Sequence, residues 1–200
     1  MKITRLAAMA KEHKSVTLIN TQEEGQTIRQ HVMIGDAVYP LDGFPVLDGD
    51  ELLAVLDVPL EKRKEYYVII GTMEDWEGMQ LLTADAHHTD REASMMECVV
   101  CTPWSTVMAA YTQSGVVFLK AEGRKVIDKE KDVSWWSRTM KSGATALIAK
   151  KGMQQIAAFM PCGNWMSDGI CEELWHIAQA ARSSMEKIKQ RESNGGQLHM

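Results

Sequence analysis

Four cysteines are the first residues whose type and spacing could do chemistry, namely bind zinc. Cys98 and Cys101 are separated by two residues, the spacing of a zinc knuckle, and Cys162 and Cys171 could supply further thiolates. The intervening Val99 and Val100, however, favour an extended strand, which points Cys98 and Cys101 to opposite faces. Cys162 and Cys171 also lack knuckle spacing, so we expect free thiols and no bound metal.

A polar segment, ADAHHTDRE (84–92), is the second candidate for chemistry. Asp85, His87, His88 and Asp90 could bind a divalent ion or act as a general acid and base. A polar loop tip is the plainer interpretation, and a metal-dependent enzyme is the least favoured alternative. The chain contains no phosphate-binding glycine loop, nucleophile elbow or HExxH motif. We therefore expect a non-catalytic protein without a cofactor.

Basic residues concentrate between positions 120 and 151, where they could meet phosphates electrostatically. Interspersed Asp128, Glu130 and Asp132 weaken this patch, and a solvated surface is the alternative. If DNA is bound, the predicted phosphate contacts are Arg124, Lys125, Arg138, Lys141 and Lys150.

The adjacent pair Trp135-Trp136 is a candidate partner-binding feature. Neighbouring residues on a strand point to opposite faces, so one ring is expected to be buried and the other partly exposed. An exposed tryptophan beside Arg138 and Lys141 could stack on a base or anchor a protein partner. Simple packing against the sheet is the alternative.

The elements that must position these residues follow from periodicity and turn signals. Helices are predicted at 3–13, after the possible N-cap Asp48, at 103–113, and over a long C-terminal stretch that includes His176. Strands are predicted at 15–20, 27–34, 37–39, 66–70, 79–83, 94–101, 116–121, 133–140, 145–149 and 153–160.

The pattern of the stretch Val32–Asp57 predicts an internal repeat, with a second version at Ala146–Ala178. Each version reads as a hairpin, a proline, a glycine-containing loop, Asp-Gly and a helix. Helices do not alternate singly with strands, which favours α+β over a doubly wound sheet. We expect an internally duplicated fold of helix plus antiparallel-strand units, with repeats at 1–101 and 102–192 and a flexible tail at 193–200.

The charge differs between the halves of the chain. Residues 1–100 carry 9 Lys+Arg against 18 Asp+Glu, and residues 101–200 carry 13 against 9. Opposite net charges favour head-to-tail association, so a homo-oligomer is expected. No continuous apolar segment reaches the roughly 18–20 residues that span a bilayer, and the N-terminus has no signal-peptide core. We expect a cytoplasmic protein without membrane contact.

The run Ile34–Arg63 (IGDAVYPLDGFPVLDGDELLAVLDVPLEKR) resembles a segment of short, uncharacterised proteins from clostridial prophages and mobile elements. Those proteins have a similar "IG…A.YPL.G.P.LD" motif, and their second-half "AA…IMP" strand resembles Ile156–Pro161 (IAAFMP). The resemblance covers most of the chain. It implies phage or mobile-element biology and no particular mechanism.

The repeated helix-plus-strand units also resemble, in topology alone, the DNA sliding clamps. Those proteins are internally duplicated and assemble head-to-tail into rings around DNA. The chain is short for such a subunit, and the predicted helix at 103–113 has no basic residue. The leading expectation is a self-assembling phage or mobile-element accessory factor that contacts DNA and phage or host replication proteins. A protein-interaction module without nucleic acid is the alternative.

Overall fold

The computed structural model describes residues 1–24, 26–72, 78–101 and 105–162, together with residues 173, 176, 177, 179, 180, 183, 184, 186 and 187, which are helical. The strands of this part are β1 (Ser15–Glu23), β2 (Gln26–Ile34), β3 (Ala37–Pro40), β4 (Tyr67–Thr72), β5 (Arg91–Cys101), β6 (Thr106–Thr112), β7 (Gly115–Lys120), β8 (Val133–Thr139), β9 (Thr145–Lys151) and β10 (Gln154–Phe159). The helices are α1 (Ile3–His13), α2 (Gly49–Val55), α3 (Met79–Thr83), α4 (Ala121–Arg124) and the 3-10 helix η1 (Leu60–Glu65).

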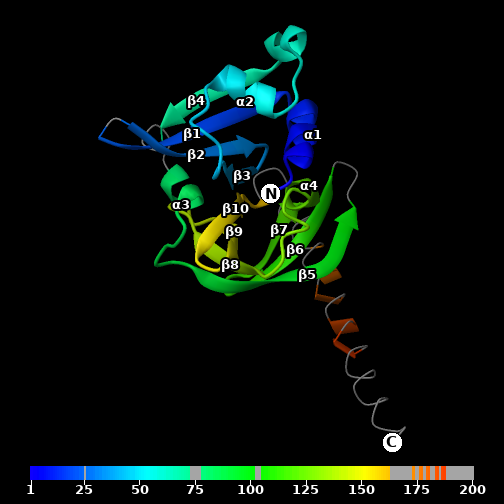
Figure 1. Ribbon diagram of the computed structural model, residues 1–200. Helices are drawn as coiled ribbons and strands as arrows, with labels where there is room; N and C mark the ends of the chain where they lie inside the picture. Colours follow the sequence, from blue (N-terminus) through cyan, green and yellow to red (C-terminus); the bar gives the residue numbers. More distant parts are fainter. Residues whose placement is uncertain are drawn as a thin grey trace, which may run out of the picture.

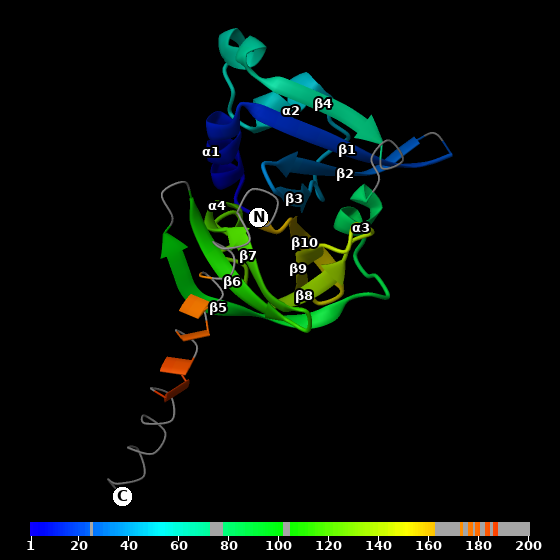
Figure 2. The same ribbon diagram turned by 180° about the vertical axis from the view of Figure 1, so that it is seen from behind.

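One mixed sheet organises the α+β fold, as the sequence predicted. Its ten strands lie in the order β4-β1-β2-β3-β10-β9-β8-β5-β6-β7, and among these described strands only the β1–β4 pair is parallel. The sheet curves strongly, so that α1 and α4 lie close together on one side of it (Figures 1 and 2). The central β3–β10 pair joins the first meander to the second.

Side chains on the two faces of the sheet form separate cores. On one face, α1 inserts Leu6 and Ala10, and α2 inserts Leu52, into a large cluster that reaches Phe159. On the other face, Leu82 of α3 packs in a smaller cluster with residues of β1, β3, β9 and β10. Helical spacing places the apolar residues of α1 on one face, which is buried. These residues are Leu6, Ala7, Met9 and Ala10.

Local capping signals define α2 as expected. The Asp48 side chain accepts a hydrogen bond from the Glu51 backbone N–H at 2.8 Å, and the Glu51 side chain accepts one from the Asp48 N–H, also at 2.8 Å. This capping box satisfies two backbone donors that a helix N-terminus otherwise leaves unpaired. Asp48 is therefore the N-cap of α2, as predicted.

Two predicted elements are wrong. The helix expected at 103–113 is strand β6, within the part that the structure describes. β6 is buried on both faces. Met108 and Ala110 belong to the large cluster, and Val107 and Ala109 belong to a third cluster with Met96, Phe118 and Cys162. A continuous apolar run of this kind has no strand-like alternation and coincides with helical spacing. The strand expected at 79–83 is the short helix α3, which is too brief for periodicity to decide.

The two predicted hairpins of the repeat are present and adjacent. β2–β3 turns at Gly35 and β9–β10 turns at Gly152, both with positive φ, and the strands meet at the β3–β10 pair. The strand order β1-β2-β3 is thus mirrored by β10-β9-β8. The second repeat lacks the helix predicted at 103–113, because β6 occupies this segment. The apolar positions of the last predicted helix and the tail at 193–200 lie outside the described residues. Duplication stays a hypothesis.

Helix α4 packs closely against the central strands β3 and β10. The Tyr39 hydroxyl donates to the Gly123 carbonyl at 2.7 Å. A Cβ at Gly123 would lie 3.1 Å from both Ala37 Cβ and Phe159 Cε1, so glycine permits this approach. The Lys2 backbone N–H then donates to the Val126 carbonyl at 2.9 Å. These contacts bring the N-terminus beside α4 (Figures 1 and 2).

None of the helices in the described part of the chain combines the length and hydropathy needed to cross a lipid bilayer.

Candidate nucleic-acid interface

Two of the predicted phosphate contacts, Arg138 and Lys150, are buried. Arg138 Nε lies 2.6 Å from Asp90 Oδ1 and Lys150 Nζ lies 2.7 Å from Asp90 Oδ2. The side chains of Arg138, Lys150 and Asp90 are 0%, 7% and 7% exposed. The prediction that Arg138 and Lys150 contact DNA phosphates does not fit the structure, because neither side chain can reach a phosphate from this buried position.

The buried cluster ties a loop and a helix to the sheet. Arg138 on β8 also donates to the Leu81 and Ala84 carbonyls, and Gln155 on β10 donates to the Leu82 carbonyl. Although burial raises the pKa of Asp90, hydrogen bonds from Arg138 and Lys150 lower that pKa to about 2. Asp90 is therefore ionised at neutral pH and pairs with both buried cations.

The histidine loop holds its polar side chains in contacts with one another and with neighbouring described residues. The His87 and His88 rings lie 4.1 Å apart by their centroids, and His87 Nδ1 contacts Thr89 Oγ1 at 2.7 Å. The loop's carboxylates are already engaged, Asp90 as above and Asp85 with Arg29 at 2.9 Å. No group of three potential ligands in the described chain could hold a metal ion.

Of the four cysteines, two have side chains that the structure describes, Cys101 and Cys162. Cys101 is exposed and is a free thiol, whereas Cys162 is buried. The side chain of Cys98 and the whole of Cys171 lie outside the described residues. Cys162 packs as an apolar side chain against Met96, Val107 and Phe118.

A surface around α4 gathers basic side chains from three separate parts of the sequence. Lys2 Nζ lies 2.6 Å from Asp128 Oδ1, and Lys151 Nζ lies 3.3 Å from Glu130 Oε2. Asp128 also interacts electrostatically with Arg5 and Lys129. We call this surface the basic patch; it comprises Lys2, Arg5, Lys125, Lys129, Lys131 and Lys151.

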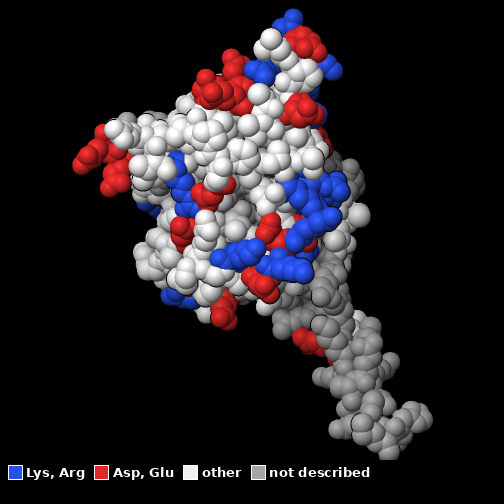
Figure 3. All heavy atoms as spheres, in the orientation of Figure 1, with Lys and Arg blue, Asp and Glu red and all other residues white. Residues whose placement is uncertain are grey.

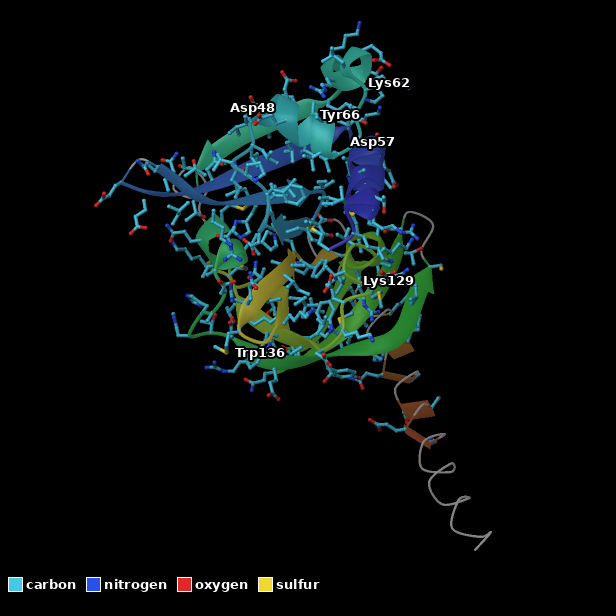
Figure 4. All side chains as sticks on the ribbon, in the orientation of Figure 1. Asp48, Asp57, Lys62, Tyr66, Lys129 and Trp136 are labelled. Carbon is cyan, nitrogen blue, oxygen red and sulfur yellow. The ribbon has the colours of Figure 1, made fainter. Side chains whose placement is uncertain are left out.

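Figure 3 shows blue side chains gathered over the region of α4 and the N-terminus. Arg5, Lys125, Lys129 and Lys131 are exposed and make no ion pair with other described residues. Their charge therefore remains available to an anionic partner. Figure 4 places Lys129 in this region, well away from Lys62 on η1.

The structure brings together only some of the predicted phosphate contacts. Lys125 belongs to the basic patch, and the half-buried Arg124 adjoins it. Lys141 is exposed but follows the opposite end of β8, about 20 Å along the strand from Val133. Sequence reasoning missed Lys2 and Arg5, which no local signal connects to residues more than 120 positions later.

Trp135 and Trp136 point to opposite faces of β8, as predicted. Trp135 packs with Phe159, their ring centroids 5.7 Å apart, on the face that carries α1. Trp136 packs on the other face, where Lys150 Nζ lies 5.0 Å from its ring centroid. Both side chains are half-buried, so the prediction of one buried and one partly exposed ring is not met. Trp135 and Trp136 are both among the residues that line one groove.

This groove has a volume of about 750 Å³ and begins where β5 and β8 separate. Its lining includes Met95 and Met96 of β5, Tyr111 of β6, Arg124 of α4, and Val133–Trp136 of β8. It combines aromatic and sulfur-containing side chains with one guanidinium, and it adjoins the basic patch through Arg124 and Lys125.

Comparison with protein-family models, with curated proteins and with solved structures found no match. The resemblances to clostridial prophage proteins and to sliding clamps therefore stay expectations from the sequence. The function must be inferred from the geometry of the patch and the groove.

Proposed function

We propose that this chain is a non-catalytic accessory protein that binds nucleic-acid backbones through the basic patch and assembles with copies of itself. The observation that carries the proposal is the set of exposed basic side chains without described ion-pair partners, Arg5, Lys125, Lys129 and Lys131. The sequence resemblance adds a phage or mobile-element setting, in which phage or host replication proteins would be the further partners.

Electrostatics supports a sequence-independent mode of binding. Lysine and arginine displace condensed counterions from phosphates, which makes affinity strongly salt-dependent. The acidic residues within the patch are already neutralised in part, because Lys2 pairs with Asp128 and the N-terminal amine pairs with Glu130. The remaining exposed cations give the patch a net positive character although the whole chain has a charge of −5.

We expect the double variant Lys125→Glu/Lys129→Glu to weaken binding to a mixed-sequence DNA duplex at least about tenfold at low salt. If each of the four exposed cations displaces about one counterion, the slope of log affinity against log salt concentration is about −4. The variant removes two of these cations, so the magnitude of its slope should be smaller by about two. Fluorescence anisotropy over a salt series measures both quantities.

The matched control is Lys62→Glu/Lys64→Glu, which makes the same charge change on exposed residues of η1. Figure 4 shows Lys62 at the far end of the molecule from Lys129. Equal loss of binding in both double variants would attribute the effect to net charge and contradict a specific patch. Absence of duplex and single-strand binding by the wild type would overturn the proposal.

Self-assembly is supported by the two ends of the sheet. Within the described chain, β4 pairs only with β1 and β7 only with β6, so each leaves one edge open. β4 (YVIIGT) carries no charge, and its Tyr67 and Ile70 are more than half exposed. Uncharged, β-branched edge strands favour pairing with another chain. The opposite net charges of the two halves favour β4 of one copy meeting β7 of the next.

We expect Tyr67→Lys/Ile70→Lys to convert an assembled wild type into a monomer, because charges on an edge strand oppose strand pairing. Light scattering at low and high salt measures the mass. Met153→Lys is the control, because Met153 is exposed in the β9–β10 turn and not on a sheet edge. A wild type that is monomeric at low salt would refute assembly and leave the DNA-binding proposal standing.

A further inference from the structure

The groove beside the basic patch is formed by a split in the sheet. β5 pairs with β8 only from Arg91 to Ala93, opposite Trp135 to Ser137. Beyond Ala93 the ladder between them ends, and β5 continues alongside β6 as far as Cys101. The space of about 750 Å³ at this point falls within the range of small-molecule sites. It therefore has room for a planar aromatic ligand.

Aromatic residues of β6 and β8 are among those that line this space. Trp135 is held against Phe159 with an angle of 34° between the ring planes. The Trp136 indole N–H donates to Ser134 Oγ at 3.0 Å, which fixes the orientation of its ring. Tyr111 lines the same groove from β6. Aromatic side chains held in this way are the surfaces on which nucleic-acid bases stack.

Cations lie at the groove and on both chain segments that flank it. Arg124 lines the groove and donates to Met108 Sδ at 3.6 Å, and no described carboxylate lies within ion-pair distance of it. Lys125 follows Arg124 directly, and Lys131 precedes the lining residue Val133 by two positions. Glu92 is the one acidic residue among the described residues that line the groove. A strand with its phosphates on the basic patch could thus place its bases in the groove.

We propose that the groove binds unstacked bases of single-stranded nucleic acid, so that the preferred ligand is a single strand and not a duplex. This inference rests on the proposed function and specifies its ligand. Bases inside a duplex are stacked on one another, and their faces are unavailable to Trp135 or Tyr111. An extended peptide is the competing occupant, because β5 beyond Ala93 has no partner on this side among the described strands and could accept one.

The test compares fluorescein-labelled dT15 with a 15-base-pair duplex by anisotropy at low salt. We expect the wild type to bind dT15 at least about tenfold more tightly than the duplex. Trp135→Leu should reduce dT15 affinity about tenfold and leave duplex affinity within about twofold, because it removes a stacking surface and no charge. Circular dichroism establishes whether the variant is folded.

Because Trp135 also packs in the core, Ser94→Ile provides a second variant. Ser94 is exposed and lines the groove, and isoleucine suits a strand, so this change fills the space without deleting a core side chain. It should weaken dT15 binding and spare duplex binding. Arg124→Met should weaken dT15 binding more than duplex binding.

The possible failures are distinguishable. Equal affinity for dT15 and duplex, or dT15 binding that neither Trp135→Leu nor Ser94→Ile alters, overturns the groove inference and leaves the basic-patch proposal intact. Absence of binding to either nucleic acid overturns both. Binding of a labelled decapeptide of alternating Glu and Val, sensitive to Ser94→Ile and accompanied by no preference for dT15, would assign the groove to a peptide instead.

Discussion

Replacing Asp90 by alanine is expected to destabilise the protein by about 3–5 kcal/mol, the largest effect of any change considered for this chain. Asp90 is the common partner of Arg138 and Lys150, and all three side chains are at most 7% exposed. Removing the carboxylate would leave two buried cations without a counter-charge. The attachment of the loop at 84–90 and of α3 to the sheet would weaken as well, since Asp90 orients the Arg138 guanidinium that donates to their carbonyls.

Urea unfolding of Asp90→Ala and the wild type measures this free energy. The control is Asp57→Ala, which breaks the ion pair with Lys11 in which the side chains are 87% and 47% exposed; it should cost about 0–1 kcal/mol. The triple variant Asp90→Leu/Arg138→Met/Lys150→Met should recover most of the loss, because it removes the charges together. An Asp90→Ala effect as small as that of the control would show that the cluster is not buried in solution.

The pH dependence of this cluster has a definite sign. The pKa of Asp90 is about 2 in the folded protein, below its ordinary value of 3.8. Its contribution to stability is therefore present above pH 3.8 and is lost as the pH falls through about 2. Acid titration above this window reports on other groups, among them His31 and His87.

Lowering the pH from 7 to 5 is expected to reduce the free energy of unfolding by about 2 kcal/mol through His31 alone. His31 is 1% exposed, and neither ring nitrogen has a hydrogen-bond partner in the described structure. Burial, together with the charge of Arg29, lowers its pKa from 6.5 to about 4, although Asp42 and Asp85 oppose this shift. Between pH 6.5 and 4 the unfolded chain binds the proton more tightly, so stability falls as the pH falls.

The matched variant for this prediction is His31→Leu. It should be at least as stable as the wild type at pH 7, because it removes an unsatisfied buried polar ring. Its stability should also lose most of the dependence on pH between 7 and 5. The pKa of His87 is lowered too, by burial and then by His88, so a small slope should persist. An unchanged slope in His31→Leu would show that His31 does not titrate in this way.

Elements that depend on neighbouring residues were predictable from the sequence. The hairpins at Gly35 and Gly152, the Asp48 cap and the amphipathic stripe of α1 each involve residues a few positions apart. The opposite orientation of Trp135 and Trp136 likewise follows from the strand itself. β6 was mistaken for a helix because burial on both faces removes the alternation that identifies a strand.

The sequence by itself thus determined the fold class, most strands and the presence of a basic segment between residues 120 and 151. Only the tertiary structure decided which of those basic residues face solvent. Arg138 is buried because Asp90, 48 residues earlier, neutralises it, whereas Lys2 joins the patch by pairing with Asp128, 126 residues later. Ion pairs between segments so far apart leave no local pattern, since their geometry exists only after the sheet and α4 have packed together.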